Sequence, residues 1–104
     1  MISVSTGNPG ALLQAIKKAI DDKKISTWNY DKDGDFIHEA AQWKDKGFLR
    51  ASLDQTYLHF SFYLFSNRPL EKDVLGVFHG RFAEMLVNHF EGSFSSIAIS
   101  NVRK

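Results

Sequence analysis

The stretch FLRASLDQTYLHFSFYLF, residues 48–65, decides the fold, because apolar residues recur at every second position on both sides of Asp54-Gln55. Such alternation is typical of half-buried strands, and two alternating segments joined tightly predict a β-hairpin. We expect strands at Phe48–Leu53 and Thr56–Phe65, with a two-residue loop that places Leu53 opposite Thr56. One face of this hairpin is apolar and is expected to face the core; it carries Leu49, Ala51, Leu53, Leu58, Phe60, Phe62 and Leu64.

The opposite face of the hairpin, here called the aromatic sheet face, carries Phe48, Arg50, Tyr57, His59, Tyr63 and Phe65. Monomeric proteins rarely expose a contiguous patch of this kind, so an interface or a ligand-binding platform is expected there. The alternative is a solvated sheet face, since tyrosine is favoured in strands for its own sake.

The remaining elements follow from capping, turn and periodicity signals. Asn8-Pro9 begins a helix that runs to about Asp22, and a second helix is expected at Leu70–Phe90. Asn67-Arg68-Pro69 breaks the chain before the second helix, and Gly92 ends it as a left-handed glycine. Further strands are expected at 25–30, 36–38 and 94–101, with a connection at 39–46.

The order α-β-β-β-β-α-β predicts an α+β fold in one domain, residues 1–104. We expect a two-layer sandwich, with a mostly antiparallel sheet of about five strands and both helices on one of its faces.

The second helix carries two apolar stripes. The broad stripe is expected to be buried and holds Val74, Leu75, Phe78, Phe82, Met85, Leu86 and His89. The smooth stripe, here called the helix seam, holds Gly76, Gly80, Ala83 and Val87. Glycine costs about 1 kcal/mol relative to alanine inside a helix, so two glycines need a packing reason. That reason is either close approach to the first helix or a dimer interface.

Composition excludes several classes of protein. The 104 residues carry 13 Lys+Arg against 12 Asp+Glu, a net charge of +1, so no strong field attracts nucleic acid. Cysteine is absent, which removes disulfides and thiolate metal sites. Neither a signal peptide nor an apolar run of membrane-spanning length is visible, so we expect a cytoplasmic protein with no membrane contact.

The segment DKDGDFIHEAAQ resembles the start of an EF-hand calcium loop, because Asp31, Asp33 and Asp35 occupy its first, third and fifth positions. It departs from that pattern at Phe36, where the loop requires glycine, and at Gln42, where it requires glutamate. The sequence therefore predicts an acidic β-turn at the start of the segment, and no metal or other cofactor is expected.

Histidine chemistry is weakly supported. None of His38, His59, His79 and His89 is paired with another at HxH or HxxxH spacing. On the second helix His79 points about 160° away from Arg81, which argues against a shared acid–base site. No catalytic residue is assigned, and His59 on the aromatic sheet face is the one candidate for a histidine-dependent enzyme.

One segment resembles an RNA-recognition motif. Lys46-Gly47-Phe48 matches the opening of its central strand, but Leu49 and Arg50 depart from the glycine or alanine and the aromatic residue that follow there.

From the two surfaces described above, we expect a small non-catalytic protein-interaction domain, acting as a homodimer or with another protein. The alternatives are a module that binds a small ligand or single-stranded nucleic acid on the aromatic sheet face, and a histidine-dependent enzyme.

Overall fold

The computed structural model describes residues 1–65, 69–100 and 102. Within them one sheet of 6 antiparallel strands has the order β2-β3-β4-β5-β1-β6. The elements in chain order are β1 (Ile2–Ser5), α1 (Pro9–Asp21), β2 (Trp28–Tyr30), β3 (Phe36–His38), β4 (Gly47–Leu53), β5 (Tyr57–Leu64), α2 (Val74–Phe90), the 3-10 turn η1 (Glu91–Ser93) and β6 (Ser96–Ile99). The predicted α+β class is confirmed.

The strand β1 was not predicted from the sequence. This strand lies between β5 and β6 and pairs with both, and its Ile2 and Val4 side chains are fully buried. The predicted order of elements therefore lacks its first member. The alternation of apolar residues with Ser3 and Ser5 was a strand signal, although a run of four residues is short for one.

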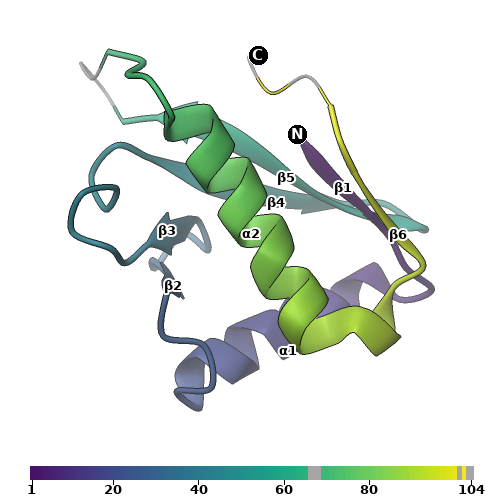
Figure 1. Ribbon diagram of the computed structural model, residues 1–104. Helices are drawn as coiled ribbons and strands as arrows, with labels where there is room; N and C mark the ends of the chain where they lie inside the picture. Colours follow the sequence, from purple (N-terminus) through teal and green to yellow (C-terminus); the bar gives the residue numbers. More distant parts are fainter. Residues whose placement is uncertain (66–68, 101, 103–104) are drawn as a thin grey trace.

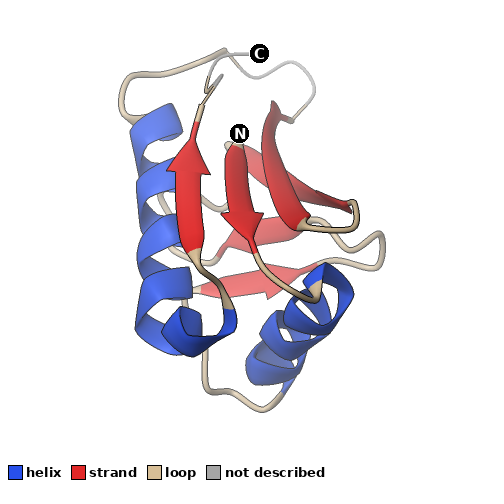
Figure 2. Cartoon of the chain, turned by 90° about the vertical axis from the view of Figure 1, so that its right-hand side faces the viewer, coloured by secondary structure: helices blue, strands red, loops and turns tan. Residues whose placement is uncertain are grey.

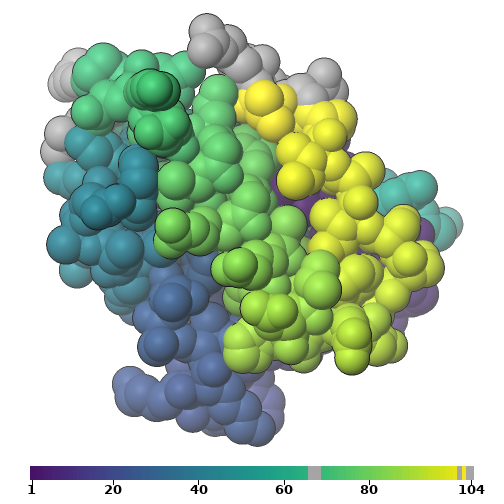
Figure 3. Space-filling model, viewed as in Figure 1, coloured from purple at the N-terminus to yellow at the C-terminus, as the bar shows by residue number. Residues whose placement is uncertain are grey.

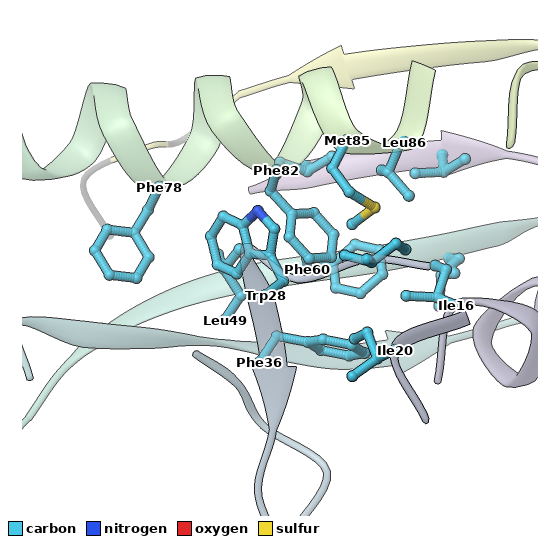
Figure 4. Packing of buried hydrophobic residues seen from close by; sticks show 14 of the residues in the cluster. Ile16, Ile20, Trp28, Phe36, Leu49, Phe60, Phe78, Phe82, Met85 and Leu86 are labelled. Carbon is cyan, nitrogen blue, oxygen red and sulfur yellow. The ribbon is translucent and has the colours of Figure 1, made fainter. Parts of the chain in front are cut away.

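Both helices pack against the same face of the sheet, and the other face has no helix over it within the described chain (Figures 1 and 2). Between the layers the aromatic rings of Trp28, Phe60 and Phe82 form the centre of the core (Figure 4). Their centroids lie 4.9 Å apart for Trp28 and Phe82, and 4.5 Å for Phe60 and Phe82. Such aromatic pairs stabilise a core beyond the area that they bury.

The hairpin forms with a shifted register. Leu53 lies opposite Leu58 rather than Thr56, so the predicted pairing was wrong. The turn falls one residue later, because Asp54 accepts the N–H groups of Thr56 and Tyr57 at 2.9 and 2.8 Å and donates its own N–H to the Tyr57 carbonyl. The slip of two residues preserves which side chains share a face. Leu53 itself, at the end of the sheet, is 50% exposed and does not join the core.

The start of α1 is as predicted, with the Asn8 side chain accepting the N–H of Ala11 at 3.1 Å. The predicted strand at 25–30 shortens to β2, because the backbone N–H of Ile25 donates to the Ala19 carbonyl of α1. The predicted last strand shortens to β6, and its Asn101 lies outside the described residues.

The boundaries of α2 differ from the prediction. It begins at Val74 rather than Leu70, because Asp73 adopts a left-handed φ of 74° that a helix cannot continue through. The predicted break at Asn67-Arg68 lies outside the described residues. Gly92 does not take a positive φ; it lies in η1, which is tied to the end of β1 by a 2.7 Å hydrogen bond from the Thr6 hydroxyl to the Ser93 carbonyl.

His89 was predicted in the buried stripe of α2 and is instead exposed. The buried residues follow the i, i+4 row through Val74, Phe78, Phe82 and Leu86, which leads to Phe90. His79 is buried in its place. No helix among the described residues has both the length and the hydropathy of a membrane span.

Candidate interaction surfaces and a candidate binding pocket

On the aromatic sheet face, Arg50 contacts two neighbouring rings. The Arg50 guanidinium lies 5.2 Å from the Phe48 ring centroid and 5.3 Å from that of Tyr63, and these two rings stack at 5.6 Å. Two N–H groups of Arg50 donate to the carboxylate of Asp35, both at 2.9 Å. Hydrogen bonding to this carboxylate, together with its charge, raises the pKa of Arg50. The Arg50 guanidinium is therefore paired with Asp35 of the same chain, whereas Tyr63 is 39% exposed.

His59, on the same face, has a polar side chain next to each of its ring nitrogens. The Ser3 hydroxyl is 2.9 Å from its Nδ1, and an Asp54 carboxylate oxygen is 3.4 Å from its Nε2. The ring of Tyr57 stacks on the imidazole at 5.6 Å. Backbone N–H groups of the turn lower the pKa of Asp54, with a smaller effect from His59. His59 does not line the cavity between α2 and the β2–β3 hairpin or the cavities along α1.

The helix seam is open. A Cβ atom built on Gly76 or Gly80 would meet no described residue within 4 Å beyond the helix itself, so neither glycine contacts α1. Ala83 is half-buried and Val87 is 49% exposed. The helix α2 lies beside β6, the edge strand of the sheet, as two views at right angles show (Figures 1 and 2). Both elements lie on one open face of the molecule (Figure 3).

A cavity of about 250 Å³ lies between α2 and the β2–β3 hairpin. Its lining residues are Thr27, Trp28, His38, Arg81, Glu84, Met85, Asn88 and His89. His38 is 3% exposed, packs its ring against Trp28 at 4.6 Å, and accepts the N–H of Ala40 on Nδ1 at 3.2 Å. Its Nε2 is buried and has no hydrogen-bond partner in the described part of the chain. Burial, and then the charge of Arg81, lower the pKa of His38, so the ring is neutral.

The three aspartates of the acidic turn lie close together, with one carboxylate oxygen of each within 4.8 Å of the others. The predicted turn is present: Gly34 has a φ of +83° and donates its N–H to the Asp31 carbonyl. Asp35 has both oxygens engaged by Arg50, and Asp31 accepts the N–H groups of Asp33 and Asp35. These contacts stabilise a turn. They also occupy both carboxylate oxygens of Asp35, the residue at the third ligand position of a calcium loop.

Comparison with protein-family models, curated proteins and solved structures gives no significant match, so the residues themselves carry the functional argument. Of the predicted site residues, Tyr57 and His59 form one cluster, and the other four form a second: Phe48, Arg50, Tyr63 and Phe65. The pocket at His38 was not predicted. The i, i+3, i+7 spacing of Arg81, Glu84 and Asn88 was its one visible signal.

Proposed function

We propose that the protein is a non-catalytic interaction domain that acts as a homodimer, and that the two copies meet at β6. The observation that carries this proposal is an uncharged strand edge with which no described residue pairs, next to the helix α2, whose seam has no side-chain bulk. A reducing compartment such as the cytoplasm suits a chain without cysteine.

No described strand pairs with the outer edge of β6. The Ser100 N–H donates to the Met1 carbonyl at 2.9 Å, which makes this pair a hydrogen-bonded position of the β1–β6 ladder. In an antiparallel ladder these positions alternate, so the N–H and C=O groups of Ile97 and Ile99 point away from β1. Edge strands are normally protected by charge, proline or a covering segment. Ser96–Ile99 has neither charge nor proline.

This edge is complementary to itself. When a second copy pairs antiparallel with Ala98 on the two-fold axis, Ile97 lies opposite Ile99 of that copy, and both carry outward-pointing backbone groups. Ala98 then lies opposite itself at a non-hydrogen-bonded position, where the two Cα atoms approach to about 4.5 Å. A small side chain suits that distance, and the absence of charge removes repulsion between the copies.

The helix seam lies on the side of α2 that the second copy would approach. On the helical wheel Gly76 is about 60° from His79. The Nε2 atom of His79 lies 3.5 Å from the backbone nitrogen of Met1. Met1 hydrogen-bonds to Ser100, so it belongs to the β1–β6 side of the sheet. Joining the two sheets would bring the two α2 helices together on one face, where glycine and alanine allow close approach.

Light scattering behind size exclusion, over a micromolar dilution series, tests the proposal. We expect a mass near twice 11.8 kDa for the parent chain. Ile99→Lys places charges beside the two-fold axis and should give a monomer, and Gly80→Leu should weaken the dimer by adding bulk to the seam. Leu53→Lys is the matched control, because Leu53 is equally exposed at a distant end of the sheet. A monomeric parent chain, or a dimer that Ile99→Lys leaves intact, would contradict the proposal.

The aromatic sheet face supports a second candidate function, binding of a flat ligand or of single-stranded nucleic acid. The supporting observation is the exposed Tyr63 ring, stacked on Phe48 beside a guanidinium. Tyr63→Ala should then fold normally and lose the ligand, whereas Tyr63→Asp should break the dimer only if this face, rather than β6, joins the copies.

A further inference from the structure

The pocket between α2 and the β2–β3 hairpin has an unusual set of uncommitted polar groups. Arg81 and Glu84 lie three residues apart on α2 and both line the cavity, yet neither forms an ion pair within the described residues. A cation and an anion are thus held at one opening without neutralising each other. Neighbouring Asn88 adds an amide that can both donate and accept.

His38 adds a buried donor to this set. Its Nδ1 accepts the N–H of Ala40, so the neutral imidazole carries its hydrogen on Nε2. That Nε2–H group is buried and no described atom accepts from it. An unpaired buried donor destabilises a fold, and in a native protein it calls for an explanation such as a bound acceptor.

The apolar part of the pocket comes from Trp28 and Met85, which lie beneath α2 (Figure 4). Trp28 is held in place by edge-on contacts with Phe78 and Phe82, so this wall is rigid. A rigid apolar wall with a few convergent polar groups is typical of a small-molecule site.

We propose that this pocket binds a small zwitterion of amino-acid size, with its carboxylate accepting from Arg81 and from the Nε2–H of His38 and its ammonium group donating to Glu84. The volume of about 250 Å³ admits one such molecule and excludes large ligands. This site is separate from the β6 edge, because no residue of β6 and no residue of the helix seam lines the pocket.

Thermal unfolding and calorimetry of the full chain test this proposal with the twenty standard L-amino acids as probes, each at about 10 mM. At least one amino acid should raise Tm by roughly 3–8 °C. Its N-acetyl and its amide derivatives, which lack the ammonium and carboxylate charges respectively, should each bind at least about 10-fold more weakly. In a nitrogen NMR spectrum the Nε2 resonance of His38 should shift on binding.

Arg81→Gln and Glu84→Gln should each weaken the binding about 10-fold and leave the unliganded fold intact, because both side chains are exposed. Lys72→Gln and Glu91→Gln are matched charge controls outside the pocket and should bind as the parent chain does. The proposal is overturned if no amino acid raises Tm, or if binding is insensitive to both pocket substitutions.

Discussion

At the scale of single residues, two buried histidines make stability depend on pH. Burial lowers the pKa of His38 and of His79 below the usual 6.5, and the hydrogen bond from His79 to the Leu75 carbonyl offsets only part of that effect. The folded chain therefore binds fewer protons than the unfolded chain just below pH 6.5.

The free energy of unfolding should consequently be constant above about pH 7 and fall as the pH drops below about 6.5. Denaturant titrations from about pH 5 to 8 measure this slope. His79→Gln should make it shallower, with His89→Gln as the control for loss of an exposed imidazole. A free energy that rises on acidification would contradict the buried, neutral state of both rings.

Residue-level prediction succeeded where the cause is local. Asn8 caps its helix and the acidic turn forms between Asp31 and Gly34 because both depend on neighbouring residues alone. His89 was predicted to be buried on α2, but His79 is buried instead. The cause is non-local, because it depends on the direction in which α2 crosses the sheet. The unpaired Nε2 of His38 likewise depends on contacts that no spacing in the sequence encodes.

At the scale of elements, two glycines should respond in opposite ways to alanine. At Gly47 in β4 a Cβ atom would lie 2.5 Å from both the Phe62 ring and the Tyr63 carbonyl, so Gly47→Ala should destabilise by about 1–3 kcal/mol. At Gly80 in α2 a Cβ atom would meet no described residue within 4 Å, so Gly80→Ala should stabilise the folded monomer by about 1 kcal/mol. Urea titration at a concentration where the chain is monomeric measures both; equal effects would contradict the described packing.

The elements themselves were predicted by periodicity, and their errors have physical causes. The hairpin register was wrong by two residues because the Asp54 side chain, rather than the backbone, determines the turn. The prediction of which side chains share a face was still right, because a register shift of two residues leaves each side chain on the same face. The strand β1 was missed because its partners, β5 and β6, are distant in sequence and its own four residues carry little signal.

At the scale of the whole molecule, α2 packs one side against the sheet and contributes other residues to the pocket and to the proposed dimer interface. If the copies join at β6, unfolding also dissociates them, and Tm must rise with protein concentration. Arg81→Gln, outside the seam, should preserve this dependence, whereas Ile99→Lys should abolish it while leaving amino-acid binding in place.

Thermal unfolding at a series of protein concentrations therefore separates the two proposals in one set of variants. A Tm independent of concentration in the parent chain would remove the dimer and leave the pocket untouched. Loss of binding together with dissociation in Ile99→Lys would instead mean that the second copy helps to hold α2 against the β2–β3 hairpin, because Ile99 is distant from the pocket lining.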